Sequence, residues 1–371
     1  MTAGEPTAPL VGAGGRRIVQ APMAGGPSTT ELAVAVSEAG GLGFLAAGYL
    51  SADVLAEQIA ATQELTTEPF GVNIFAPVRT PAMRAVVAAY AERITALAEA
   101  AGVELGTPRF DDDQFDDKLI VVSRAKPAVV SFVFGCPDPG TIADLRARGI
   151  AVWVTVTNAD EAQVAALAGA DAIVVQGAEA GGHRGSFTDT DEAPLELIPM
   201  LDAVRTRLTE LPVRSLRCAV VAAGGLQTGA QIAGALAAGA DAAQLGTAFM
   251  LTPEAATSPA HRVALAGPRP TTLTRAFTGR LARGISNAWT DAIGADAPSA
   301  YPEIHHLTSV LRAHGRTVGD PDLFNLWAGV GYGQARALPA AELVAALTAE
   351  TDAAMADTAA EATGLDAARQ F

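Results

Sequence analysis

Short apolar runs alternate with longer segments of helical periodicity along the first two thirds of the chain. The apolar runs are typical of buried strands, and the segments between them are typical of amphipathic helices. The predicted strands span residues 18–23, 42–46, 70–75, 128–134, 151–156, 172–175, 218–222 and 242–245. The predicted helices span residues 32–39, 52–63, 81–101, 140–148, 159–168, 195–208 and 228–238. This order predicts parallel strands joined by right-handed helical crossovers.

Eight strands are the number that closes an α/β fold into a (β/α)8 TIM barrel, which usually takes about 250 residues. Residues 16–252 fit such a barrel with one insertion at about residues 80–126. Residues 1–15 are aperiodic and predict a flexible N-terminal tail. A doubly wound open sheet is the alternative, but no G-x-G-x-x-G turn follows the first strand.

The alternation ends after residue 252. Residues 253–371 contain helical patterns at 340–350 and 351–363, and a stretch at 278–289 that predicts a loop. We therefore expect an α-helical cap, formed by the insertion and the C-terminal region, over the mouth of the barrel.

The charge of the chain narrows the class of partner. Its 371 residues carry a formal net charge of −15 and no long basic run, which disfavours nucleic acid and anionic membranes as partners. No apolar run is long enough to span a membrane and the first residues do not resemble a signal peptide, so we expect a cytoplasmic protein. Small molecules are the expected partners, and a homodimer is compatible with the sequence.

Most of the candidate chemistry lies in residues 171–187, where a predicted strand runs into a loop with four glycines and His183. In a barrel the strand C-termini all point to one mouth, so this loop is expected there. His183 would act there as an acid or base, or would donate a hydrogen bond to an anionic oxygen. The alternative is a structural histidine that is bonded to a carbonyl group.

Other strand ends supply candidate ligand contacts. Backbone N–H groups after the last two strands suit a phosphate, although the same glycines would also permit tight turns. This phosphate set comprises Gly224, Gly225, Gly246 and Thr247. The amides of Asn73 and Gln176 would reach the edge of a heterocycle or would cap neighbouring backbone, and Met23 would pack on a ring or simply in the core.

Metal and hydrolase chemistry are not favoured. His305 and His306 are adjacent and cannot face one way on a helix, and the two cysteines form no zinc-ligand pattern. The acidic run at 111–117 predicts a solvated loop, and no G-x-S-x-G elbow is present.

Five long stretches carry a family resemblance. They are residues 21–50, 71–77, 129–137, 171–187 and 222–250, with weaker matches at 278–287 and 301–312. On these residues the chain resembles class I nitronate monooxygenases, formerly called 2-nitropropane dioxygenases. It departs from the family pattern at Thr30, where proline is common, and at Cys136, where leucine is usual.

The resemblance implies a TIM barrel that binds FMN non-covalently and oxidises alkyl nitronates of the propionate 3-nitronate type with O2. The implied reaction passes through a flavin semiquinone, gives a carbonyl compound and nitrite, and needs no NAD(P)H. By motif, the flavin contacts fall on Met23, Asn73, Gln176, Gly181, Gly225, Gln244, Leu245, Gly246 and Thr247. The catalytic histidine falls on His183, which would bond the nitro oxygens and take the α-proton of neutral nitroalkanes. Tyr301 matches a tyrosine that contacts the substrate.

Two alternatives remain open at this stage. The first is an FMN-dependent NAD(P)H reductase of a quinone or an enoyl thioester, because such relatives share the phosphate loops. The second is a flavin- or phosphate-binding protein without turnover.

Overall fold

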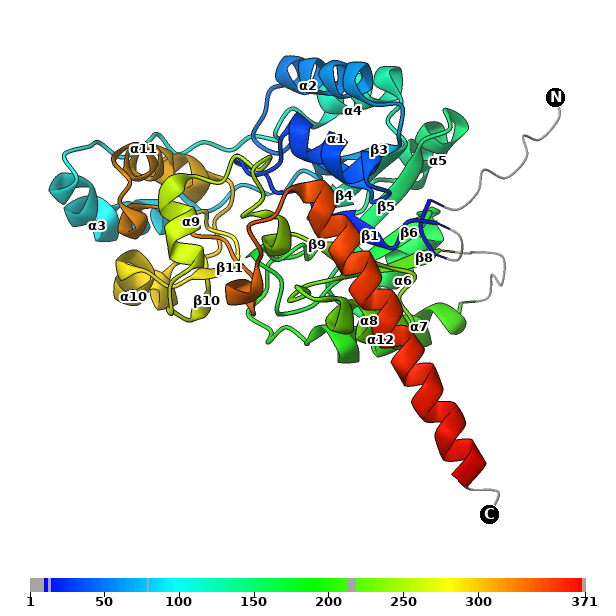
Figure 1. Ribbon diagram of the computed structural model, residues 1–371. Coiled ribbons are helices and arrows are strands. Elements are labelled where there is room, and N and C mark those ends of the chain that lie inside the picture. Colours follow the sequence, from blue (N-terminus) through cyan, green and yellow to red (C-terminus); the bar gives the residue numbers. More distant parts are fainter. Residues whose placement is uncertain (1–9, 13–14, 79, 212–217, 369–371) are drawn as a thin grey trace.

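The barrel is the larger of two lobes in the computed structural model, which describes residues 10–12, 15–78, 80–211 and 218–368 (Figure 1). Its parallel strands are β1 (Ile18–Gln20), β2 (Gly43–Ala46), β3 (Phe70–Phe75), β4 (Val129–Val133), β5 (Ala151–Val156), β6 (Ala172–Gln176), β8 (Ala219–Ala223) and β9 (Ala242–Leu245). They pair in the order β1-β9-β8-β6-β5-β4-β3-β2. A bridge between Val19 and Leu42 joins β1 to β2, and the Gln20 N–H donates to the Leu42 carbonyl at 2.9 Å. The sheet therefore closes, and the predicted (β/α)8 barrel is confirmed.

Helices surround this sheet. They are α1 (Thr30–Glu38), α2 (Ala52–Leu65), α4 (Phe115–Ala125), α5 (Pro139–Ala147), α6 (Ala159–Ala168), α7 (Leu197–Thr209) and α8 (Gly229–Ala237). Five of them begin at a side chain that accepts a backbone N–H of the first turn, as N-caps do: Thr29, Ser51, Asp138, Asn158 and Thr228.

The interior of the barrel is filled from its strands. Val19, Phe44, Trp153 and Val174 belong to one buried apolar cluster there. Val11 joins the same cluster and is 4% exposed. A flexible tail was predicted at residues 1–15. Most of that range, residues 1–9 and 13–14, lies outside the described residues.

The segment at 80–126 contributes to both lobes. α3 (Arg84–Ala100) packs against α11 (Glu303–Val318) of the cap, whereas α4 packs against α2 and β3 as a barrel helix. A solvated loop was predicted for the acidic run within this segment, but one of its aspartates is held by protein groups. The Asp113 carboxylate lies 2.6 Å from Nζ of the buried Lys118, and its Oδ1 accepts the N–H of Tyr49 at 3.0 Å. A buried lysine needs such a partner, which draws this aspartate inward.

The cap combines helices with a small antiparallel sheet. Besides α3 and α11 it contains α9 (Pro259–Leu265) and α10 (Ala288–Ile293). The sheet pairs β10 (Thr271–Thr274) with β11 (Ala282–Ile285), and β11 with β7 (Gly182–His183). The prediction of a loop at 278–289 is therefore wrong for residues 282–285, where β11 pairs with the neighbouring β10 and with β7, which lies far away in the sequence.

The last helix, α12 (Ala340–Ala368), returns from the cap to the barrel. It packs against α8 and α1, and Leu343, Val344 and Leu347 join the barrel's outer core. Its C-terminal turns extend beyond the barrel (Figure 1, red). The described part of the chain contains no helix that is long and apolar enough to cross a membrane.

Candidate active site

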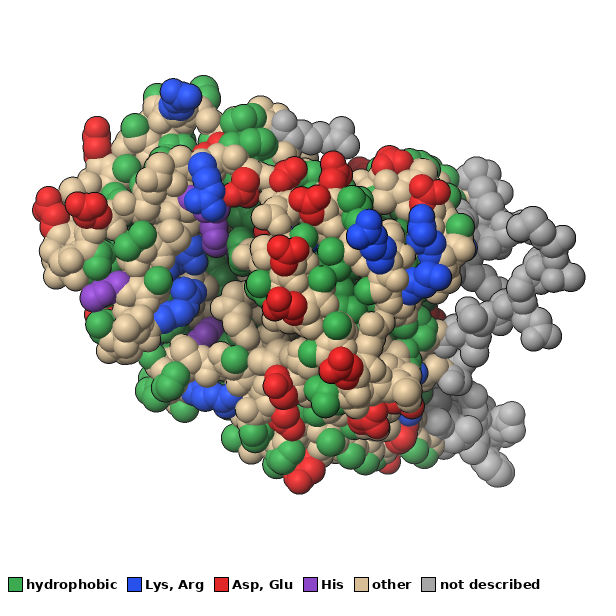
Figure 2. Space-filling view, turned by 90° about the horizontal axis from the view of Figure 1, so that it is seen from above, with side chains coloured by type: hydrophobic (Ala, Val, Ile, Leu, Met, Phe, Trp, Pro, Cys, Tyr) green, Lys and Arg blue, Asp and Glu red, His purple; other side chains and the backbone are tan. Residues whose placement is uncertain are grey.

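A cavity of about 250 Å³ lies where the C-terminal ends of the barrel strands meet the cap. Figure 2 shows the hollow between the two lobes, with basic and histidine side chains along the cap side and acidic side chains over the barrel surface beside it. The cavity thus has a positive wall in a chain whose formal net charge is −15.

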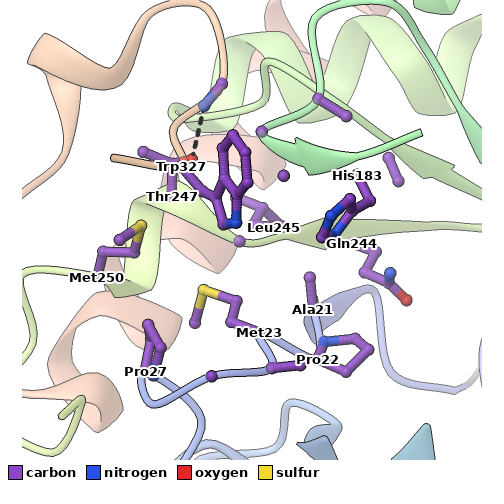
Figure 3. A pocket seen from close by; sticks show the side chains of 18 of the residues that line it. Ala21, Pro22, Met23, Pro27, His183, Gln244, Leu245, Thr247, Met250 and Trp327 are labelled. Atoms are coloured by element: carbon purple, nitrogen blue, oxygen red, sulfur yellow. Dashed lines mark hydrogen bonds between the residues drawn. The ribbon is translucent and has the colours of Figure 1, made fainter. Parts of the chain in front are cut away.

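The cavity brings together almost every residue that the sequence singled out. Its lining includes Met23, Asn73, Gln176, Gly181, His183, Gly224, Gly225, Gln244, Leu245, Gly246 and Thr247. Figure 3 shows Pro22 and Met23 on one side of the open space and Trp327 and His183 on the other. Tyr301 is not part of this lining. Its ring centroid lies 6.1 Å from that of His183, so it packs beside the histidine.

His183 is held on β7 by pairing with Ala282 of the cap sheet. Its Nε2 lies 2.9 Å from Oγ1 of Thr278, and the ring of Trp327 packs edge-on at 5.4 Å between centroids. Although the ring keeps some accessible surface toward the cavity, the protein around it is dense. This burial, followed by the positive charges of Arg280 and Arg312, lowers the pKa of His183 to about 3. The imidazole is therefore neutral at physiological pH.

The side chains of Gln176 and Arg184 fix the loop that carries His183. The Gln176 amide donates to the His183 carbonyl at 3.0 Å and accepts the N–H of Gly185 at 2.8 Å. The Arg184 guanidinium donates to the carbonyls of Gln176 at 3.0 Å and Gly177 at 2.9 Å. Of the two interpretations of Gln176, backbone capping is thus present, although the residue also borders the cavity.

The amide of Asn73 is likewise engaged by protein. Its Nδ2 donates to Oγ of Ser131 at 2.9 Å, across the β3–β4 pair. The residue is 4% exposed and still borders the cavity.

Backbone N–H groups at the ends of β8 and β9 have no protein partner. Those of Gly224, Gly225, Gly246 and Thr247 donate to no acceptor within residues 15–78, 80–211 and 218–368. Gly224 has φ +124° and Gly225 has φ +69°, a backbone region that favours glycine. Unpaired, convergent N–H groups of this kind suit an anion.

The first turn of α8 does not add all of its backbone N–H groups to these donors. The N–H of Gly229 is taken by Oε2 of Glu350 at 3.0 Å, because α12 crosses this helix end. Nearer the cavity, Oγ1 of Thr247 accepts the N–H of Gly329 at 3.0 Å (Figure 3).

Two buried arginines make the cap side positive. Cζ of Arg280 lies 4.1 Å from the ring centroid of Phe134, and its Nε donates to the Arg184 carbonyl at 3.2 Å. Arg312 donates to the carbonyl of His305 at 2.8 Å. Neither arginine forms an ion pair with a carboxylate in the described parts of the chain.

Sequence reasoning missed the cap residues of the site. Asn325, Trp327 and Gly329 border the cavity, whereas Leu326 and Ala328 pack into a core cluster of the cap. This period of two is typical of an extended segment with one face on a ligand space, and it was visible in the sequence. The cavity is also bordered by Tyr49, His261 and Arg316, and no local sequence pattern predicts that they lie there.

No group of three or more potential metal ligands (His, Cys, Asp or Glu) is found among the residues that the structure describes. The site is therefore built from an imidazole, guanidinium groups and backbone donors around an apolar floor.

Comparison with known proteins gives a consistent result. The family model described as nitronate monooxygenase matches residues 13–350. A nitronate monooxygenase of Paraburkholderia phytofirmans is 42% identical over 92% of this chain and 93% of its own length. That of Pseudomonas aeruginosa is 39% identical over 90% of this chain and 95% of its own length.

Solved structures agree with the sequence matches. A nitroalkane oxidase from Streptomyces ansochromogenes superposes with a TM-score of 0.88 at 47% identity, covering 92% of this chain and 97% of that one. FabK from Thermotoga maritima superposes with a TM-score of 0.71 at 25% identity, covering 94% of this chain and 96% of that one. Because these matches cover most of its length, including the barrel and the cavity, the chain belongs to the nitronate monooxygenase family, whose members are oxidoreductases.

Proposed function

We propose that this protein oxidises alkyl nitronates with O2, using bound FMN, to a carbonyl compound and nitrite. The observation that carries the proposal is the placement of His183. A neutral imidazole, flanked by the charges of Arg280 and Arg312, borders a cavity whose floor is apolar and whose far end holds unpaired N–H groups. Such a cavity suits a flat anionic cofactor and a small anionic substrate together.

The residues present fit FMN. The unpaired N–H groups of Gly224, Gly225, Gly246 and Thr247 would hold its phosphate, and Met23 with Pro22 would support one face of its ring. Once bound, FMN would supply the redox centre that accepts electrons from the substrate, which no side chain of the site can do.

His183 and the neighbouring arginines would act on the substrate. The positive potential of Arg280 and Arg312 attracts a nitronate anion and opposes a proton on His183. The Thr278 hydroxyl shares a hydrogen bond with Nε2 of His183 at 2.9 Å, which fixes the orientation of the ring. Nδ1 has no partner among the described residues and is the ring atom that meets the substrate.

This arrangement favours nitronates over neutral nitroalkanes. An imidazole with a pKa of about 3 is a weak base, so removing an α-proton is costly, whereas a nitronate arrives already deprotonated. We therefore infer that kcat/KM for a nitronate exceeds that for its parent nitroalkane.

One experiment tests the proposal. The purified protein is examined for a flavin spectrum and is mixed anaerobically with propionate 3-nitronate, then in a separate run with NADH. We expect the nitronate alone to reduce the flavin. Rapid bleaching by NADH without any response to the nitronate would instead identify an NAD(P)H-dependent reductase, and a bound flavin that responds to neither would indicate a binding protein.

A further inference from the structure

Two aromatic residues beside the cavity have backbone conformations that side chains rarely adopt. Tyr49 has φ +71° and Phe134 has φ +74°, in the left-handed region that favours glycine. Of the five non-glycine residues with positive φ in the described parts of the chain, only these two border the cavity. The conformation costs free energy that a glycine would not lose, so the aromatic side chains themselves are what these two positions retain.

The Phe75 ring joins these two residues into one aromatic cluster (Tyr49, Phe75 and Phe134). Its centroid lies 5.3 Å from that of Tyr49 and 4.8 Å from that of Phe134. A Cβ at Gly48 would overlap the Phe75 ring, so the absence of a side chain there makes room for it. All three rings border the cavity, which therefore has a continuous apolar side at this place.

The aromatic cluster lies across the barrel mouth from the phosphate end. Phe75 ends β3 and Phe134 follows β4, and in the closed order of the sheet these strands stand opposite β8 and β9. Phe75 shares a face of β3 with Asn73 and is about 6–7 Å nearer to the cap. The Phe134 ring meets His183 edge-on, at 5.8 Å between centroids. The cluster is therefore level with the reacting position, beyond the flavin edge expected at Asn73.

Tyr49 closes the end of this apolar side. Its ring stacks face to face on His305 of α11, with 4.1 Å between centroids and 4° between the planes. Its N–H is accepted by Oδ1 of Asp113, whose Oδ2 lies 2.6 Å from Nζ of the buried Lys118. The ring is thus held between the barrel loop that carries it and the cap.

We propose that Tyr49, Phe75 and Phe134 form an apolar subsite for the carbon chain of the substrate, in which Tyr49 limits the length of the chain. The reacting group lies at His183, and the chain runs along the rings toward Tyr49. Unbranched aliphatic chains that stop short of the Tyr49 ring are preferred, and longer ones are rejected. This inference rests on the proposed function for the reacting end, but a pocket closed by Tyr49 would select the chain length of any ligand with a planar anionic head.

A series of unbranched nitronates, from ethyl to octyl, tests the subsite in the FMN-loaded enzyme. While the chain lengthens along the rings, kcat/KM should rise by about fourfold for each methylene that is buried. At the length where the chain meets Tyr49, kcat/KM should fall, because overfilling a packed site costs free energy. The longest chain before this fall is the length limit.

Tyr49→Gly opens the end of the pocket without adding backbone strain, because glycine adopts positive φ and keeps the N–H that Asp113 accepts. We expect the length limit to increase by about two carbon atoms. For the first chain that the wild type rejects, kcat/KM should be roughly tenfold higher than in the wild type. A purely structural role of Tyr49 would change kcat/KM by the same factor at every chain length.

Two further variants of Tyr49 grade this effect. Tyr49→Leu leaves part of the side chain and should increase the length limit by less, and it decides the test if the glycine variant does not fold. Tyr49→Phe keeps the ring and should keep the length limit. The matched control is Phe110→Gly, because Phe110 is 40% exposed and does not border the cavity. Its replacement should leave kcat/KM unchanged for every nitronate.

A binding measurement separates the subsite from the reaction. Unbranched monocarboxylates, from acetate to octanoate, have a planar head with two oxygens but do not react. Calorimetric titration of the purified protein should show the same length limit, and the same increase in Tyr49→Gly and Tyr49→Leu. An identical dependence on chain length in the wild type and in these two variants would overturn the subsite. If no nitronate is oxidised but the limit for monocarboxylates still moves with Tyr49, the proposed function fails and the subsite stands.

Discussion

The two walls of the cavity are built from different kinds of groups. The barrel wall offers backbone N–H groups at Gly224, Gly225, Gly246 and Thr247 and the apolar Met23, all fixed at strand ends. The cap wall offers the imidazole of His261 on α9, the guanidinium group of Arg316 on α11, and the amide of Asn325 and the ring of Trp327. Backbone donors carry no side-chain entropy and demand no charge. Under the proposed function, the cofactor would be recognised mainly by the geometry of the backbone, whereas the substrate would be recognised mainly by side chains.

The largest expected effect comes from placing a charge on the barrel wall. A Cβ at Gly246 would meet Ala21 and Sδ of Met23 at ordinary distances of 3.6 and 3.8 Å, so a side chain fits there without strain. Gly246→Asp would set a carboxylate beside the expected phosphate, and like-charge repulsion should weaken FMN binding by roughly 10³-fold. Flavin fluorescence on titration of the apoprotein measures this.

A glycine outside the site serves as the control for that change. Gly234 lies within α8 and a Cβ there would meet nothing within 4 Å. Gly234→Ala should leave flavin affinity unchanged and raise the free energy of unfolding by about 0.5–1 kcal/mol. Normal flavin binding by Gly246→Asp would remove the phosphate assignment.

The cap side is tested next at the residue that both walls share. His183→Asn should keep the flavin but lower kcat/KM for neutral nitroalkanes by roughly 10²-fold, because proton transfer is lost. Nitronates, which need no deprotonation, should be affected less. Steady-state rates on nitroethane and on its nitronate, with flavin content measured in parallel, decide this. Unchanged turnover of nitroethane would end the general-base role.

Acid should act on the cap through its histidines. In the folded protein the pKa values of His183 and His261 are about 3 and about 4, below the ordinary value of 6.5. Between each folded pKa and 6.5, the unfolded chain therefore binds more protons than the folded one. Stability is therefore complete above about pH 7 and falls as the pH is lowered. Each histidine should account for at most about 2 kcal/mol of the free energy of unfolding lost between pH 7 and pH 5.

Urea titrations at both pH values, on the wild type and on His261→Asn, measure this loss. Between pH 7 and pH 5 the variant should lose less free energy of unfolding than the wild type, by about the contribution of one histidine. An identical pH dependence in both proteins would show that His261 is not held neutral by the fold.

The smallest expected effect concerns orientation rather than charge. Thr278→Val removes the hydroxyl that lies 2.9 Å from Nε2 of His183 but preserves the shape of the side chain. We expect about a fivefold loss of kcat/KM for nitroalkanes, since one hydrogen bond that orients the ring is lost. A tenfold or larger loss of flavin affinity in the same variant would mean that Thr278 supports the cofactor instead.

The barrel wall could be read from the sequence because its signals are local. A short apolar run that ends in Met23, Asn73, Gln176 or the glycine pairs marks a strand C-terminus, and barrel closure then brings these ends together. The number of strands was enough to place residues at or after five of the eight strands around one cavity.

The cap wall could not be read in the same way. Arg316 and His261 lie on helices whose periodicity says which face is buried but not what it is buried against. Residues 278–289 predicted a loop, but β11 within them pairs with β10 and with β7, which lies almost a hundred residues earlier. Only the alternation at 325–329 offered a usable signal.

The pairing of β7 with β11 makes the reactive histidine an edge residue of the cap. The N–H of Arg184 also donates to the Leu281 carbonyl at 2.8 Å, which continues the same ladder past His183. If the cap sheet lifts to admit substrate or to release product, it must either break this ladder or take His183 with it. If His183 moves with the sheet, opening of the cap also displaces the imidazole from the cavity. The imidazole then returns to its place beside the substrate only when the cap closes.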